Sequence, residues 1–176
     1  MRIALCSTFP PQRCGIATYT QNLAKVLVQE GHEVLIVAER ADVADVVNGP
    51  PIQVIRAWDR KTNWVKDIVD ALRSVRVDLA HIQHVPGILA LDGSLGELCR
   101  RLRGMGIATV TTLHSVHTLR SAYLERLFDV RSFYRSLAEH CDATIVHQEQ
   151  TALSSLRRNG LAAERIAVIP HGTSEL

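Results

Sequence analysis

Histidine is the residue type in this sequence that is best suited to the chemistry of a site. Two pairs have the spacing H-x-x-H, His81 with His84 and His114 with His117. A zinc site needs three or four convergent ligands. The H-x-x-H spacing puts two rings on one side of a helix, but these pairs lie at the ends of apolar runs that are expected to be strands, where the two rings do not converge. We therefore predict no metal site. A neutral imidazole in such a place is better suited to hydrogen-bonding a ligand, or to a structural role, which we expect for His81.

The segment "FPPQRCGIATYT", residues 9–20, is the second place where chemistry is expected. Its two prolines stiffen the loop, Gly15 allows a ligand to approach the backbone, and the helix that follows offers N–H groups around Ile16 that favour an anion. A simple strand-to-helix turn explains the same residues, and both interpretations stay open because G-x-G-x-x-G is absent. Cys14 is expected to be sensitive to oxidation or alkylation. It has no histidine partner nearby and the sequence contains no G-x-S-x-G, so we predict no nucleophile.

The elements that must position these residues alternate between short apolar runs and longer helical periods. Unbroken apolar runs such as "VLIVA" and "ATIV" are typical of parallel strands covered on both faces. Gly31 is expected to end the first helix, and Thr62 or Asn63 to cap the second. The sequence predicts an α/β domain with a Rossmann-like, doubly wound, mostly parallel sheet. About seven strands are expected, at 2–6, 33–38, 52–56, 79–83, 108–113, 143–147 and 165–169, with helices near 16–30, 62–75, 95–103, 119–140 and 148–158.

This fold class also predicts where a ligand binds. In doubly wound sheets, ligands lie beyond the carboxyl ends of the strands. Seven of the eight histidines follow Asp78, and six of those lie within or beside the carboxyl end of a predicted strand. The predicted ligand-binding edge comprises residues 7–15, 83–92, 114–119, 147–149 and 170–176.

The composition excludes several classes of protein. The 176 residues include 20 basic and 18 acidic side chains, a net charge of +2 that gives no reason to expect a nucleic-acid partner. Four cysteines without C-x-x-C spacing indicate no disulfide framework. No stretch approaches the roughly 18 apolar residues that span a membrane, and the apolar start is too short for a signal peptide. We therefore expect a cytoplasmic protein.

Four segments in register resemble the amino-terminal half of glycosyltransferase family 4, the retaining GT-B enzymes. They are "FPPQRCGIATYTQNLAKVLVQEGHEVLIV", "TLHSV", "CDATIVHQEQTALSSL" and "RIAVIPHGTSE", and together they extend over essentially the whole chain. One departure from the family pattern is that the opening loop, which often carries Gly-Gly, has Cys14-Gly15 here. The sequence offers no explanation for Cys14.

The resemblance implies a two-lobed parent enzyme that transfers a sugar from a nucleotide-sugar to an unknown acceptor, such as a sugar or a lipid-linked sugar. Residues 1–176 would be the single acceptor-side domain, ending at the crossover "VIPHG". The donor-binding domain with its E-x7-E motif would be absent, so we expect no activity from the isolated lobe. No cofactor is implied beyond the donor substrate. A cleft face without its partner lobe makes self-association plausible, and a peripheral membrane contact stays open.

Residue roles follow from the resemblance by position. Gly15 and the helix start after it, at Ile16, would face the diphosphate of the donor, whose leaving phosphate gains charge that helix N–H groups stabilise. Cys14, next to them, is included in the expected substrate-binding set. His114, the predicted catalytic residue, would position a hydroxyl of the acceptor or the transferring sugar rather than attack it. The expected substrate-binding set is completed by residues on other loops of the same edge: His84, Gly87, His117 and His171.

Two further hypotheses come from other classes of protein. A binding or regulatory module that keeps the lobe without catalysis would show the same segments, and the coding sequence downstream of Leu176 would separate it from an enzyme. A small enzyme of the dinucleotide-binding class is disfavoured because the G-x-G-x-x-G fingerprint is absent.

Overall fold

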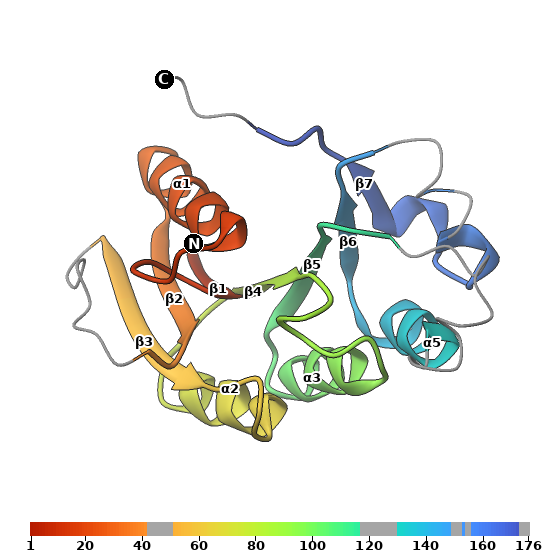
Figure 1. Ribbon diagram of the computed structural model, residues 1–176, viewed down its shortest axis with the longest axis horizontal. Helices are drawn as coiled ribbons and strands as arrows, with labels where there is room; N and C mark the ends of the chain where they lie inside the picture. The colour runs from red at the N-terminus through yellow and green to blue at the C-terminus, as the bar shows by residue number, and fades with distance from the viewer. Residues whose placement is uncertain (42–50, 117–129, 149–152, 154–155, 173–176) are drawn as a thin grey trace.

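The computed structural model describes residues 1–41, 51–116, 130–148, 153 and 156–172. It confirms the predicted α/β architecture, with a seven-stranded sheet between helices (Figure 1). In chain order the elements are β1 (Arg2–Ser7), α1 (Gly15–Gln29), β2 (Glu33–Glu39), β3 (Ile52–Trp58), α2 (Trp64–Arg73), β4 (Leu79–His84), α3 (Ser94–Gly104), β5 (Ala108–Leu113), α5 (Val130–His140), β6 (Ala143–Val146), the 3-10 turn η1 (Ala163–Arg165) and β7 (Ile166–Val168).

Several predicted boundaries differ from the observed ones by one or two residues, and β3 extends two residues further, to Trp58. The indole of Trp58 is fully buried and its N–H donates to the carbonyl of Val37, so tertiary contacts extend this strand. The predicted helix at 119–140 is described only from Val130 onward, and most of the helix predicted at 148–158 lies outside the described residues.

The sheet has the strand order β3-β2-β1-β4-β5-β6-β7, and all its pairings are parallel. The chain moves outward from β1 through β2 and β3, then returns to continue on the other side of β1 with β4. The loops after β1 and β4 therefore leave the sheet in opposite directions, which opens a crevice at this switch point.

Helices cover the two faces of the sheet unequally. Figure 1 shows α1 on one face and α2, α3 and α5 on the other. The larger core lies on the second face and includes Trp58, Phe133 and Tyr134, all buried. A smaller core, with Leu5 and Ile36, lies under α1. The face that carries α1 therefore has less apolar cover along β4, β5 and β6, and polar side chains occupy it.

Helix ends follow the expected chemistry. The Asn63 side chain caps α2 by accepting from the N–H of Lys66 at 3.1 Å. Gly31 follows the end of α1 with φ of 83°, a conformation that favours glycine. Gly96 has another role, because a Cβ there would lie 2.6 Å from the backbone carbon of Ser136. Its missing side chain thus lets α3 pack closely against α5.

Candidate functional site

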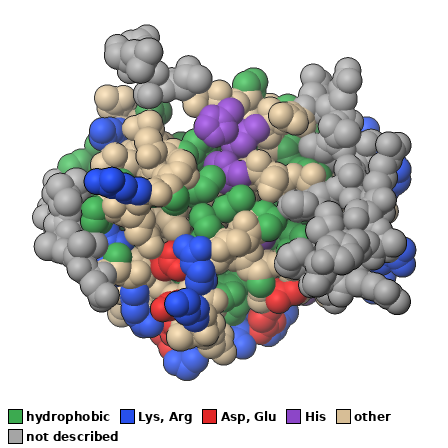
Figure 2. Space-filling model, in the orientation of Figure 1, with side chains coloured by type: hydrophobic (Ala, Val, Ile, Leu, Met, Phe, Trp, Pro, Cys, Tyr) green, Lys and Arg blue, Asp and Glu red, His purple; other side chains and the backbone are tan. Residues whose placement is uncertain are grey.

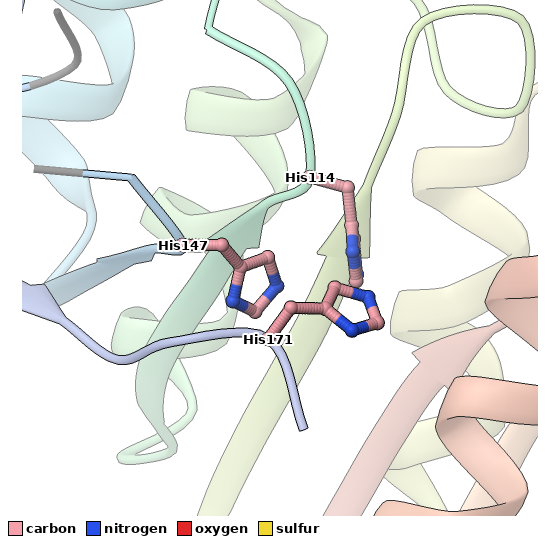
Figure 3. Close-up of side chains that lie close together, drawn as sticks. All are labelled: His114, His147 and His171. Atoms are coloured by element: carbon pink, nitrogen blue, oxygen red, sulfur yellow. The ribbon is translucent and has the colours of Figure 1, made fainter. Parts of the chain in front are cut away.

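Three histidines from three different strand ends meet at one edge of the sheet. His114 follows β5, His147 follows β6 and His171 lies beyond β7, and their rings face one another (Figure 3). The ring centroids are 5.0 Å apart for His114 and His147 and 4.8 Å apart for His147 and His171. One ring nitrogen of each lies within 4.8 Å of the others. Histidine side chains gather at one place on this face of the molecule (Figure 2), and we call these three residues the histidine group.

Tyr19 from α1 forms a wall of the histidine group. Its ring centroid lies 4.8 Å from that of His114, 5.7 Å from His147 and 5.1 Å from His171. Burial raises the pKa of its phenol, so the ring stays neutral at physiological pH. Tyr19 lies one helical turn after Gly15, and this spacing connects the start of α1 to the histidines.

Each ring of the histidine group is oriented by one hydrogen bond to an oxygen atom. His114 Nε2 donates to Oε1 of Gln83 at 2.9 Å, and His147 Nδ1 donates to the carbonyl of Ile169 at 2.8 Å. His171 Nδ1 donates to the carbonyl of Gly172 at 3.0 Å. The three rings are therefore held from outside the group rather than by one another.

A polar ladder on the face that carries α1 supports His114. The period-2 alternation of strands puts His81 and Gln83 of β4 on the same face, next to Thr112 of β5 and His114 beyond it. His81 Nε2 and the hydroxyl of Thr112 are hydrogen-bonded at 2.7 Å. Burial lowers the pKa of His81 to about 4. For His114, burial lowers the pKa to about 4 as well, with a contribution from the neighbouring histidines. Both rings are therefore neutral at pH 7.

Cys14 has a structural role that the sequence did not reveal. It is the N-cap of α1, with extended backbone angles, and its sulfur accepts from the N–H of Ala17 at 3.3 Å. The hydroxyl of Thr8 lies 3.1 Å from the same sulfur. Thr18 N–H bonds the Cys14 carbonyl, while no described residue accepts from the N–H of Gly15 or Ile16. A Cβ at Gly15 would meet nothing within 4 Å, so the start of α1 is open to a ligand.

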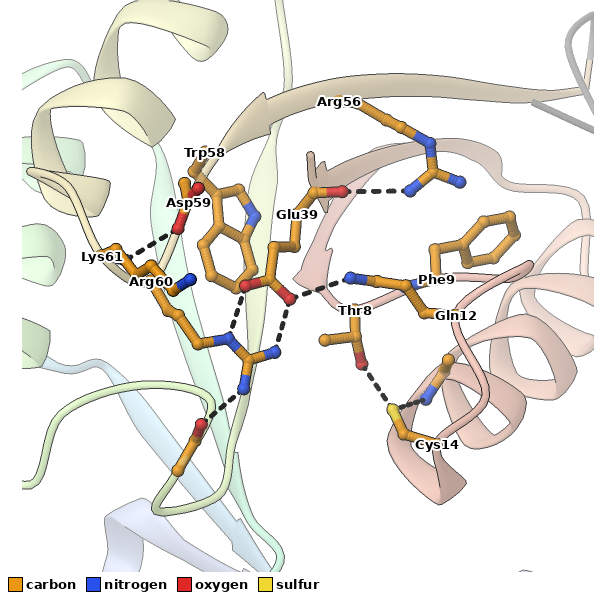
Figure 4. A network of polar contacts seen from close by, with 12 residues as sticks. Thr8, Phe9, Gln12, Cys14, Glu39, Arg56, Trp58, Asp59, Arg60 and Lys61 are labelled. Carbon is orange, nitrogen blue, oxygen red and sulfur yellow. Dashed lines mark hydrogen bonds and ion pairs between the residues drawn. The ribbon is translucent and has the colours of Figure 1, made fainter. Parts of the chain in front are cut away.

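An ion pair between the buried Glu39 and the partly exposed Arg60 helps to fasten the loop after β1, residues 8–14, which we call the opening loop. Glu39, at the end of β2, accepts two hydrogen bonds of 2.5 Å from Arg60 and one of 2.9 Å from Gln12 (Figure 4). Arg60 also donates to the carbonyl of Gly87 at 2.6 Å. These hydrogen bonds from Arg60 and Gln12 lower the pKa of Glu39 despite its burial. The network therefore ties the opening loop to the loop after β4.

The main chain of the opening loop is fastened as well. Arg56 in β3 donates to the carbonyl of Pro10 at 2.7 Å and to the carbonyl of Glu39 at 3.0 Å. The Phe9 ring is buried in the core under α1. The position of the open helix start is thus set by contacts that do not involve the histidine group.

The predicted site residues take different positions. Gly15, Ile16 and His171 lie at the expected edge, and Gly87, with φ of 95°, lies in the loop tied to Arg60. His84 is fully buried, with its ring 4.7 Å from that of Phe133 and Nε2 donating to the carbonyl of Ala90 at 3.3 Å. His117 lies outside the described residues. His81 has the structural role expected from the sequence.

Sequence reasoning missed the partners of these residues. His147 stood at a strand end in the sequence but had no predicted role, and Tyr19, Gln83, Glu39 and Arg60 carried no local signal. Glu39 alone was detectable in principle, because a carboxylate at the end of an otherwise apolar strand needs a partner.

Within the described residues, no helix combines the length and apolar character needed to span a membrane.

A sequence model described as Glycosyltransferase Family 4 matches residues 14–175. The chain belongs to glycosyltransferase family 4. None of the curated proteins matches its sequence. This family 4 chain spans between about a third and half the length of the similar solved glycosyltransferases.

Several solved structures share the fold of this family 4 chain. A UDP-glucosyltransferase from Polygonum tinctorium, capable of glucosylating indoxyl, has a TM-score of 0.55 at 11% identity, covering 98% of this chain and 52% of that one. A UGT transferase from Siraitia grosvenorii in complex with UDP has a TM-score of 0.55 at 11% identity, covering 98% and 48%. An alpha-glucosyltransferase in complex with UDP has a TM-score of 0.50 at 17% identity, covering 85% and 35%. These similarities establish the Rossmann-like fold of a glycosyltransferase lobe.

Proposed function

We propose that this chain is the acceptor-side half of a retaining glycosyltransferase that transfers a sugar from a nucleotide-sugar donor. The observation that carries the proposal is the family 4 match over residues 14–175. The arrangement of the carboxyl edge of the sheet supports it, because the open start of α1 and the histidine group flank the switch point, and Tyr19 of α1 contacts the ring of His114. A second, donor-binding domain would complete the cleft.

The start of α1 is suited to the diphosphate of the donor. The N–H groups of Gly15 and Ile16 have no partner among the described residues, and the helix dipole favours an anion there. Negative charge grows on the leaving phosphate during transfer, so donors fixed in advance stabilise the transition state more than the ground state. The Glu39–Arg60 network holds this helix start in place.

His114 is suited to orienting a hydroxyl group. Its Nε2–H is bonded to Gln83, so in the neutral ring Nδ1 carries a lone pair that can accept from a substrate hydroxyl. Its low pKa keeps the ring neutral at physiological pH. We assign His114 to positioning the acceptor or the transferring sugar, and we assign no nucleophile to the chain.

The test uses the complete enzyme, with this chain joined to its donor-binding domain. Transfer of radiolabelled sugar from a nucleotide-sugar is measured for the wild type, His114→Ala and His140→Ala. Loss of the group that orients a reactant is expected to lower kcat about 100-fold. His140, at the end of α5 and away from the group, should leave the rate unchanged.

Full activity in His114→Ala would remove His114 from the proposal. Nucleotide-sugar transfer by residues 1–176 alone would contradict the division into two halves. Absence of transfer by the complete protein with every donor tried would favour a binding or regulatory module.

A further inference from the structure

We propose that the histidine group binds a divalent metal ion of the zinc class through one ring nitrogen from each of His114, His147 and His171 (Figure 3). The inference goes beyond the proposed function and does not rest on it, since metal binding is measured without sugar transfer. A bound ion would use the Nδ1 lone pair of His114 that the proposed function gives to a substrate hydroxyl, and that hydroxyl would then bind at the open position of the metal. It departs from our sequence-based expectation of no metal site. That expectation considered only histidines close in sequence, whereas these three come from separate strand ends.

The hydrogen bonds of the three rings leave the nitrogens that a metal needs. Amide and carbonyl oxygens only accept, so the nitrogens bonded to Gln83, Ile169 and Gly172 all carry protons. In a neutral imidazole the other nitrogen then holds a lone pair. The nitrogens that can bind a metal are therefore Nδ1 of His114, Nε2 of His147 and Nε2 of His171. Metal-binding histidines are typically held in this way, with the second ring nitrogen donating to an oxygen atom.

The lone pair of His147 has no partner among the residues that the structure describes. Its Nε2 is buried and has no hydrogen-bond partner among the described residues. A buried polar atom without a partner is costly and calls for an explanation such as a bound ion. A metal at the centre of the group would supply the missing partner and would use the other two lone pairs as well.

The spacing of the rings fits a metal after small rotations. The three nitrogens lie within 4.8 Å of one another. Points at such separations lie at most about 2.8 Å from a common centre, whereas a zinc–nitrogen bond is about 2.0–2.1 Å long. Each nitrogen would therefore move inward by about 0.8 Å. Side-chain rotation is sufficient for this movement, and the strand ends stay where they are.

The donor set also indicates the kind of metal and site. Imidazole nitrogens suit Zn²⁺, Ni²⁺ and Cu²⁺ rather than Mg²⁺ or Ca²⁺, which prefer oxygen ligands. Among the described residues, no fourth cysteine, histidine or carboxylate joins the group. Three protein ligands with one position left open are typical of zinc sites that hold a water or a substrate oxygen. His171 is exposed, so that position faces solvent.

The experiment titrates the 176-residue chain with Zn²⁺ against a chromophoric chelator, and with Co²⁺ in a visible absorption measurement. We expect one equivalent of Zn²⁺ to bind and Co²⁺ to give the intense bands of a tetrahedral site. His171→Gln should weaken Zn²⁺ binding at least tenfold. Removing a residue that only hydrogen-bonds to a metal ligand already weakens binding by about 10–100-fold, so removing a ligand should cost no less. His147→Gln should weaken it by a similar factor.

His140→Gln is the matched control, because it removes one histidine of the chain but none of the group. It should bind Zn²⁺ like the wild type. Since His171 is exposed, its variant keeps the test valid even if His147→Gln misfolds, and circular dichroism reports folding of each variant. Absence of stoichiometric binding would overturn the proposal. So would equal losses in His171→Gln and His140→Gln, which would mark weak binding to scattered histidines.

Discussion

The opening loop and the histidine group lie at the same edge of the sheet but are built in opposite ways. The buried carboxylate beside the opening loop has its counterparts, as Glu39 accepts from Arg60 and Gln12, and Arg56 donates to the carbonyl of Pro10. In the histidine group each ring uses one nitrogen for a bond and leaves the other with a lone pair directed to no described residue. The buried carboxylate of the first region is paired, while the free ring nitrogens of the second have no partner among the described residues.

The contrast separates stability from function within one edge. A satisfied buried network strengthens the fold, whereas an unsatisfied buried polar atom costs about 1–3 kcal/mol. Nε2 of His147 has no partner in the described part of the chain, so we expect a cost to stability that a bound ligand would remove, and such costs are typical of functional sites. We conclude that the opening loop mainly positions the start of α1, and that the histidine group is where a ligand changes the energy most.

The largest expected effect comes from breaking the network of the opening loop. Glu39→Ala should lower the free energy of unfolding by about 3 kcal/mol, because it removes three hydrogen bonds to a buried carboxylate, and hydrogen bonds to charged groups contribute about 1.5–3 kcal/mol each. Chemical denaturation at pH 7 measures this loss.

Glu33→Gln, at the opposite end of the same strand, is the matched control. Its ion pair with Arg2 is 3.8 Å long and the Glu33 side chain is 75% exposed. The control should change the free energy of unfolding by less than about 0.5 kcal/mol. Similar losses in both variants would mean that the network does not fasten the loop.

The next effect concerns acid and the ladder beneath the histidine group. The folded-state pKa of His81 is about 4, below the ordinary 6.5, so between these values the unfolded chain binds more protons. Stability is then complete above about pH 6.5 and falls as the pH falls toward 4. For His81 alone, the free energy of unfolding should drop by about 2 kcal/mol between pH 7 and pH 5.

Denaturation series at the two pH values check this prediction. His81→Gln keeps a hydrogen-bonding partner for Thr112 but cannot titrate. Between pH 7 and pH 5, the free energy of unfolding of this variant should fall by about 2 kcal/mol less than that of the wild type. An equal loss in both proteins would show that His81 is not the group responsible.

The smallest effect should come from the histidine group itself. In metal-free buffer, His147→Leu should change the free energy of unfolding by less than about 1 kcal/mol, since it removes an unsatisfied buried nitrogen along with one hydrogen bond. His81→Leu should cost about 2 kcal/mol, because it strands the buried hydroxyl of Thr112. Thermal and chemical unfolding of the pair compares them directly, and the opposite order would refute the distinction between complete and incomplete regions.

The sequence was sufficient for the parts of the fold that depend on local chemistry. Unbroken apolar runs predicted the parallel strands, and Asn63 and Gly31 predicted helix ends. The switch-point rule pointed to the edge of the sheet where the structure places the histidine group, and ligand binding there stays a prediction. These signals lie within a few residues of the feature they predict, so one sequence contains them.

The remaining features depend on contacts between distant residues. His114, His147 and His171 converge because β5, β6 and β7 are adjacent and end at the same edge of the sheet. The spacing of residues in the sequence does not indicate which strands are adjacent. The pairing of Glu39 with Arg60 likewise requires a particular course of the loop after β3. Cys14 was missed for another reason, because cysteine is not among the residues usually found as helix N-caps.

β7 consists of only three residues at the edge of the sheet, and His171 lies three residues beyond it. The amide of Ile169 bonds the carbonyl of Val146, and the carbonyl of Ile169 in turn orients His147. Short edge strands open far more often than the molecule unfolds as a whole. Each opening would separate His171 from His147 and release the bond that holds the His147 ring. The rate of amide hydrogen exchange at Ile169 would therefore report how often the site opens, and a bound ligand should slow that exchange.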